Sequence, residues 1–303
     1  MVLKSKIKNK INGLIRRGRW YNETLLGGAS KFRSFNKYNL DVVNLGSTSS
    51  LYAFDYSTLS INGFNWALSS QYLLADYEIL RNYSTFLKER ATVILCACLF
   101  SLDGYDITYF DDRYYTFLYP SSIFQYSVQR KDKVQDMIKN PVKYYPLLSF
   151  FSFIKGLFKK QGTPQLSDLQ YEEDARRWMI DVWAKQFSID DFEAPPSLRN
   201  KDLIEQSLDI VNNIKSFCLE KGFNFVIVLP PVSMELRKWL TPHVRDNYVY
   251  ALKNSNLLKG VKFLDYLDDP QFEGHMFFQN AYIMNSFGAK AFTKRVLSDL
   301  NII

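Results

Sequence analysis

The chain contains few of the residues that bind metals or cross-link a fold. Its 303 residues include only three cysteines and two histidines. The cysteines, Cys96, Cys98 and Cys218, cannot all pair with one another and do not have the spacing of a zinc or iron–sulfur site. We therefore expect free thiols in a reducing compartment, with no metal and no cofactor.

Long apolar runs are also missing. No run approaches the roughly 20 residues of a membrane-spanning helix, and the longest candidates, residues 91–99 and 146–158, are short or interrupted. The basic start of the chain is not followed by the apolar core and cleavage site of a secretory signal. We expect a cytoplasmic protein, and a globular one, because 47% of its residues are hydrophobic and 16% aromatic.

Acidic residues are absent from the first 20 positions. This segment contains four lysines and three arginines, and the net charge of the whole chain is +7, so the rest of the chain is neutral overall. Apolar residues recur there at the spacing of one helical face, namely Leu3, Ile7, Ile11 and Leu14. The pattern predicts a basic amphipathic helix within an N-terminal arm, residues 1–25.

Three partners are compatible with this arm. Residues 1–20 suit an anionic membrane surface, which would place the protein at the inner face of the plasma membrane. The four apolar side chains could instead dock the arm on its own domain. Nucleic acid is the least favoured partner, because no basic groove with interleaved aromatic residues occurs elsewhere.

From residue 38 onwards, short apolar runs alternate with amphipathic stretches. This order predicts a three-layer, flavodoxin-like α/β domain over residues 38–303, with helices on both faces of a parallel sheet of about five strands. Ser70 is expected to cap the helix after the second strand. The expected strands are residues 41–45, 64–68, 91–99, 223–231 and 261–265, and the expected later helices are residues 172–186, 202–220 and 289–300.

Residues 103–168 interrupt this alternation. They are dense in Tyr and Phe, and we interpret them as a helical insertion packed over one end of the sheet. Within the insertion, the apolar stretch 144–158 is followed by Lys159 and Lys160. This stretch could cover the sheet, form a lid over a cleft, or make a second membrane contact beside the basic arm.

Two segments carry a resemblance to a known superfamily. The strand at residues 41–45 runs into Gly46-Ser47-Thr48-Ser49-Ser50, and residues 277–293 read FFQNAYIMNSFGAKAFT before the last helix. Together they resemble the SGNH (GDSL-like) hydrolase superfamily, and most closely its branch in cell-surface polysaccharide loci. In that branch a strand ends in Gly-Ser-Ser, whose second Ser is the nucleophile. A later Asp-x-x-His-Leu-Asn-x-x-Gly-Ala supplies the acid and the base.

By this resemblance, the chain retains residues that frame the active site but lacks the reactive groups. It places the nucleophile at Thr48, the acid at Asn280 and the base at Ile283, while Asn285 and Gly288 still match. Acyl transfer through a hydroxyl requires a base within hydrogen-bond reach, and an isoleucine cannot accept a proton. The resemblance therefore implies a non-catalytic relative that binds a saccharide or a polysaccharide-assembly protein. The pocket residues that it implies are Gly46, Asn65, Ser70, Gln71 and Asn285.

Two other functions stay open. An active O-acyltransferase or esterase would need a relocated nucleophile, Ser47, Ser49 or Ser50, with His275 as the base and Glu273 or Asp269 to orient it. A peripheral membrane scaffold would use the basic arm and the aromatic insertion.

The remaining candidates have simpler interpretations. His243 is expected at the start of a surface helix, and Asp265, Asp268 and Asp269 are expected in an acidic turn rather than a metal site. If the superfamily topology holds, Thr48 and the loop 280–283 meet at the carboxyl edge of the sheet, with Ile283 in the place of an imidazole.

Overall fold

The computed structural model describes residues 2–18, 20–33, 35–100, 110–157 and 166–303. It divides into two compact units. We call Met1–Asn36 with Thr108–Pro164 the helical unit, and Lys37–Ile107 with Gln165–Ile303 the sheet unit. The N-terminal arm and the insertion, which we expected as separate features, thus belong to the same unit.

The sheet unit is built on five parallel strands in the order β2-β1-β3-β4-β5. This is the strand order of flavodoxin-like folds, and it confirms the expected fold class. The chain moves outward from β1 to β2 and then crosses to the other side of β1, so the order reverses between β1 and β3. The strands are β1 (Leu40–Leu45), β2 (Gly63–Asn65), β3 (Leu87–Cys96), β4 (Asn224–Leu229) and β5 (Lys262–Asp265).

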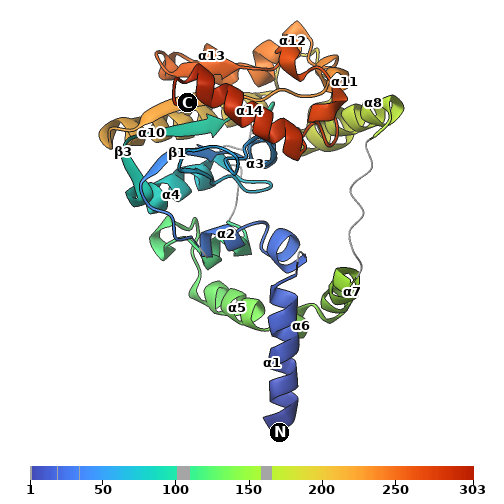
Figure 1. Ribbon diagram of the computed structural model, residues 1–303. Helices are drawn as coiled ribbons and strands as arrows, with labels where there is room; N and C mark the ends of the chain where they lie inside the picture. The colour runs from blue at the N-terminus through green and yellow to red at the C-terminus, as the bar shows by residue number, and fades with distance from the viewer. Residues whose placement is uncertain (1, 19, 34, 101–109, 158–165) are drawn as a thin grey trace. The chain divides into compact units, whose positions relative to one another are not determined.

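Helices cover both faces of this sheet (Figure 1). On one face α4 (Leu73–Tyr83) packs against α10 (Leu198–Glu220), and on the other α3 (Thr48–Ala53) packs against α14 (Ser286–Asp299). Residues 91–96 of β3 are all buried, as expected for a strand covered on both sides. The hydrophobic effect of this burial is the main force that holds the three layers together.

Several element boundaries follow from local chemistry. Gly222 ends α10 as expected, with φ +71, and the amide of Phe223 donates to the Cys218 carbonyl. The prediction that Ser70 caps α4 is wrong: the residue before the helix is Tyr72, and Ser70 has φ +49 in the preceding turn. The second strand ends at Asn65, three residues earlier than expected, because the Asn65 side chain accepts the amide of Ala67.

A long helical segment precedes α10. It begins with α8 (Asp168–Arg176), continues as the π-helix η5 (Arg177–Ala184) and ends with α9 (Lys185–Phe187). The expected helix at residues 172–186 is thus present, but half of it is wound as a π-helix. The Ser167 side chain and Gln170 form a capping box at its start. The later crossovers of the sheet unit contain α11 (Met234–Arg237), α12 (Pro242–Val244), η6 (Arg245–Val249) and α13 (Ala251–Asn254).

The helical unit has a small aromatic core. The rings of Phe32 and Phe117 stack with centroids 4.4 Å apart, and the Tyr21 hydroxyl donates to the Ile138 carbonyl over 3.1 Å. The expected helical character of the insertion is observed over its described residues, whereas 103–109 and 158–165 lie outside them. The elements of the unit are α1 (Val2–Arg16), η1 (Trp20–Leu25), α2 (Ser30–Arg33), η3 (Asp112–Thr116), η4 (Pro120–Ser122), α5 (Val128–Lys139), α6 (Pro141–Tyr144) and α7 (Pro146–Leu157). Over the described residues of both units, no helix is long and apolar enough to cross a bilayer.

The packing of α14 against the preceding loop leads to a stability prediction. A Cβ at Gly288 would lie 2.1 Å from the Phe277 carbonyl oxygen, whereas at Gly274 the nearest atom, a Met276 side-chain carbon, is 3.7 Å away. Gly288→Ala should therefore lower the free energy of unfolding by about 1–3 kcal/mol. Gly274→Ala, the matched control, should leave it nearly unchanged in chemical denaturation. Equal stability of the two variants would contradict this account of the α14 contact.

Candidate functional site

A cavity of about 340 Å³ lies beyond the carboxyl ends of β1 and β3, where the strand order reverses. Ligands of open parallel sheets bind at this position, because helix connections diverge there and leave a crevice. All described residues that line the cavity belong to the sheet unit. The cavity has a polar floor and an aromatic wall.

The floor is organised by the buried carboxylate of Asp76, in the first turn of α4. Asp76 accepts a hydrogen bond of 2.7 Å from the Gly46 amide, at the end of β1, and a second one from the side-chain amide of Gln71. Gly46 has φ +124, and a Cβ there would lie 2.5 Å from the Cys96 carbonyl oxygen. Only glycine fits this close approach of the first turn to β3.

Gln71 lines the cavity and carries a buried acceptor atom. Its side-chain nitrogen donates to Asp76, which fixes the orientation of the amide, and its buried Oε1 has no hydrogen-bond partner. Gln71 itself is buried and lines the cavity. A buried acceptor without a partner costs free energy, so a small movement of Gln71 that brings Oε1 to a ligand or water donor would be stabilising.

The hydroxyl groups of the first turn bond to the turn before α4. The Ser70 amide donates to Thr48 Oγ1 over 3.1 Å, and the Gln71 amide donates to Ser47 Oγ over 3.1 Å. Thr48 Oγ1 also lies 3.3 Å from Ser69 Oγ. The backbone amides of Ser70 and Gln71 are therefore already bonded to this chain's own side chains.

The C-terminal loop reaches the cavity through Tyr282. Asn280 Oδ1 accepts the amides of Tyr282 and Ile283 over 3.0 and 2.9 Å, so its side chain shapes its own loop. Tyr282 lines the cavity together with Thr48. The two segments thus meet, but the expectation that Ile283 faces this space is not met. Burial raises the pKa of the Tyr282 hydroxyl well above its ordinary value.

The aromatic wall comes mainly from the π-helix. Trp178 and Trp183 lie five residues apart, and π-helical winding turns residues with that spacing onto one face. Their ring centroids are 5.5 Å apart, and Tyr282 packs against both, at 4.6 Å from Trp178 and 5.0 Å from Trp183. Phe100, after β3, completes the wall 4.9 Å from Trp183. The indole nitrogen of Trp178 is buried without a hydrogen-bond partner.

None of the described residues that line the cavity is a histidine. His275 stacks on Tyr171 at 3.9 Å, and its ring nitrogens lie 3.0 Å from Glu235 and 3.3 Å from Asp168. Burial acts to raise the pKa of Glu235, but hydrogen bonds from its own amide, Ser233 and His275 outweigh burial and lower it. His275 is therefore bound to an ionised carboxylate away from the hydroxyl groups of the first turn.

The other candidates for a relocated site have partners that do not assemble a nucleophile with a base. Ser49 Oγ lies 3.4 Å from Cys98 Sγ, and Ser50 Oγ donates to the Leu45 carbonyl. The two acids expected to orient His275 face arginines: Glu273 lies 4.0 Å from Arg237, and Asp269 lies 3.4 Å from Arg295.

Two of the expected pocket residues have structural contacts instead. The Asn65 side chain donates to the carbonyls at the end of α3, and Asn285 accepts the Gly288 amide at the start of α14. Neither lines the cavity, whereas Gly46, Ser70 and Gln71 do.

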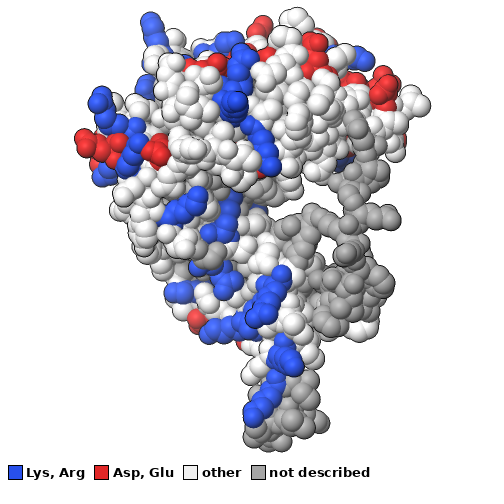
Figure 2. Space-filling view, in the orientation of Figure 1, with Lys and Arg blue, Asp and Glu red and all other residues white. Residues whose placement is uncertain are grey.

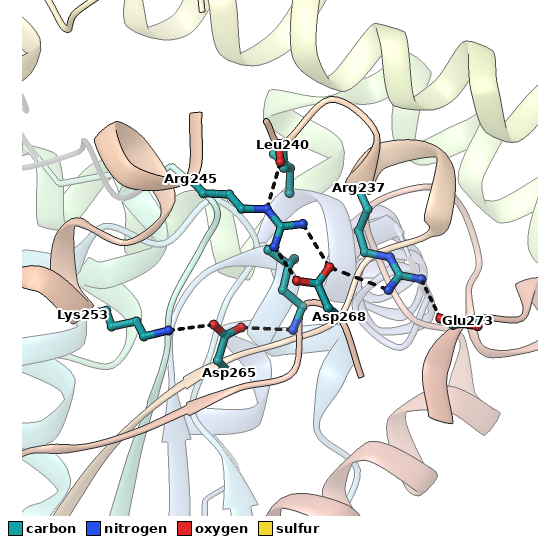
Figure 3. Close-up of polar contacts among 8 residues, drawn as sticks. Arg237, Leu240, Arg245, Lys253, Asp265, Asp268 and Glu273 are labelled. Atoms are coloured by element: carbon teal, nitrogen blue, oxygen red, sulfur yellow. Dashed lines mark hydrogen bonds and ion pairs between the residues drawn. The ribbon is translucent and has the colours of Figure 1, made fainter. Parts of the chain in front are cut away.

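The acidic turn after β5 pairs with basic side chains (Figure 3). Asp268 receives two hydrogen bonds from Arg245 and lies 3.9 Å from Arg237, and Asp265 lies 3.2 Å from Lys253. These ion pairs link the last residue of β5 and the loop after it to the helices that follow β4. His243, at the start of α12, lies 3.2 Å from the Ala194 carbonyl oxygen. Among the described residues, no cluster of three or more potential ligands could hold a metal ion.

Comparisons with known proteins add no relative. No protein-family model matches the chain, and neither does any curated protein.

Sequence reasoning missed Asp76, Tyr282 and the tryptophan pair. Asp76 did leave a signal, because its spacing of three from Leu73 and four from Leu80 places it on the same face of the helix as these two leucines. The tryptophan pair left none, since a spacing of five does not place two residues on one face of an α-helix.

The thiols give a direct probe of the cavity. Cys96 and Cys98 both line it, but Cys98 is half-buried and Cys96 is buried; burial raises the pKa of Cys218 to about 12 and that of Cys96 well above its ordinary value. A small maleimide should therefore modify Cys98 in the native protein and reach the other two thiols only after unfolding. Mass spectrometry after brief labelling should locate the adduct, and Cys98→Ser should remove it. Labelling of Cys218 before Cys98 would contradict the geometry.

Proposed function

We propose that the sheet unit is a non-catalytic, SGNH-like binding domain whose cavity holds a neutral polyhydroxylated ligand, such as a single sugar residue. The observation that carries this proposal is the buried, unpartnered Gln71 Oε1 on a polar floor that faces an aromatic wall. The resemblance associates this binding with the synthesis or modification of a surface polysaccharide.

The chemistry of the cavity favours a neutral sugar over an anion. A sugar hydroxyl can donate to Gln71 Oε1, and the apolar C–H face of a sugar ring can pack on Trp178 and Trp183. The buried carboxylate of Asp76 opposes the entry of a phosphate or carboxylate group. The cavity volume is near the lower end of the about 300–1,000 Å³ typical of ligand pockets, so a single sugar residue fits better than an oligosaccharide.

The lack of an acid–base pair at the first turn supports a binding role. Thr48 and Ser47 accept backbone hydrogen bonds, Ile283 cannot take a proton, and His275 is bound to Glu235. Loss of a triad member typically lowers the rate by about 10⁴–10⁶. Assignment to the SGNH superfamily is supported by the strand order and by the meeting of the Gly46 turn with the loop 280–283.

Ligand binding can be followed through the tryptophans of the wall. Titration with glucose, galactose or N-acetylglucosamine should change the intrinsic fluorescence with at least one of these sugars, whereas inorganic phosphate should not. Trp183→Phe should weaken the response, while Trp239→Phe, a half-buried tryptophan outside the cavity lining, should retain it. Identical responses of the two variants, or saturation by phosphate instead of sugars, would refute this ligand class.

Hydrolysis of p-nitrophenyl acetate tests the absence of catalysis separately. The purified protein should not exceed background, and His275→Ala should behave like the unaltered chain because His275 does not reach the first-turn hydroxyls. Turnover above background that disappears in His275→Ala would replace the binding proposal with that of an active esterase or acyltransferase.

A further inference from the structure

Helix α7 of the helical unit exposes apolar side chains and buries a polar one. Leu147, Leu148, Phe150 and Phe151 are between 52% and 71% exposed, whereas Ser149 is only 1% exposed. The usual amphipathic arrangement of a surface helix is thus reversed over the described side chains of α7. Contiguous exposed apolar residues of this kind mark a contact surface.

Helix α1 lies beside α7 and also buries a polar side chain while it exposes apolar ones. Its buried Asn12 faces inward, where Asn12 Nδ2 lies 3.4 Å from Asn140 Oδ1 and Asn12 Oδ1 accepts the Val142 amide. Ile11 and Leu14 are exposed, and only Ile15 of the described apolar residues on α1 is buried. Within the helical unit, α1 runs out beyond α6 and α7 with the N-terminus at its far end (Figure 1). The side chains of Leu3 and Ile7, which we placed on the same face, lie outside the described residues.

Positive charge surrounds this apolar surface. Lys6, Lys8, Lys10, Arg16 and Arg17 are all exposed, and α1 contains no acidic residue. Figure 2 shows blue side chains along α1. An apolar surface beside a helix that carries basic and no acidic residues complements an anionic lipid bilayer, where apolar groups enter the headgroup boundary and cations meet lipid phosphates.

We propose that the helical unit is a docking module for anionic membranes, with α1 and α7 lying together in the headgroup region. A second copy of the chain fits this surface less well, because a contact between two such surfaces would bring cationic helices together. Nucleic acid would use the lysines but would leave the leucines and phenylalanines of α7 in water. The surface belongs to the helical unit alone, so this inference does not depend on the ligand of the cavity.

Vesicle co-sedimentation of the full chain tests the proposal. The protein should bind vesicles of phosphatidylcholine mixed with phosphatidylglycerol, and should bind vesicles of phosphatidylcholine alone much more weakly. Two variants remove one contribution each. The α7 variant combines Leu148→Ser with Phe151→Ser and removes part of the apolar surface. The α1 variant combines Lys6→Gln, Lys8→Gln and Lys10→Gln and removes positive charge. Each should weaken binding by roughly tenfold or more, since a lysine near an anionic surface contributes about a fivefold change.

The matched control is Leu198→Ser with Leu219→Ser, which removes two exposed leucines from α10 of the sheet unit. It should bind vesicles as the unaltered chain does, and thermal unfolding should show that all variants remain folded. Added salt should reduce the contribution of the lysines and leave that of α7. Failure of the unaltered chain to bind anionic vesicles would overturn the proposal. Vesicle binding by the α7 variant equal to that of the unaltered chain would also overturn it. So would a dimer in solution that the α7 substitutions dissociate, if the protein does not bind vesicles.

Discussion

The buried carboxylate of Asp76 holds the cavity of the sheet unit together. It accepts hydrogen bonds from the Gly46 amide at the end of β1 and from the Gln71 side chain in the turn before α4. The end of β1 and the turn before α4 thereby share one acceptor, and the Gln71 amide can adopt only one orientation. The unpartnered Oε1, on which the proposed ligand contact depends, is a consequence of that orientation.

The other side of the cavity depends on a change of helical winding. The π-helical segment Arg177–Ala184 turns Trp178 and Trp183 onto the same face, and Tyr282 packs against both. An apolar wall then faces a floor whose hydroxyl groups already accept backbone hydrogen bonds. This arrangement can orient a ligand through one side-chain acceptor and aromatic contacts. The described residues of the lining include no histidine to activate Ser47 or Thr48, and the Asp76 carboxylate is bound by the Gly46 amide and by Gln71.

The sequence was sufficient to predict the sheet, because apolar runs of strand length separated by amphipathic helices are typical of parallel α/β folds. The sequence also predicted that the Gly46 turn and the loop 280–283 lie at the same edge of the sheet. It did not show which residue of that loop faces inward, since the Asn280 side chain folds the loop and presents Tyr282 instead of Ile283. The prediction that Ser70 caps α4 was wrong because the Ser70 amide donates to Thr48 in the turn before the helix. The burial of Ser149 in α7 could not be predicted from hydropathy, because it depends on how the helix packs.

A crystal structure of the protein soaked with the sugar that gives the strongest fluorescence response tests the central claim most directly. The account predicts an intact sugar beyond the carboxyl ends of β1 and β3, with one hydroxyl within hydrogen-bond distance of Gln71 Oε1 and its ring against Trp183. A sugar bound elsewhere would contradict the account, and so would a covalent adduct on Ser47, Thr48 or Ser49.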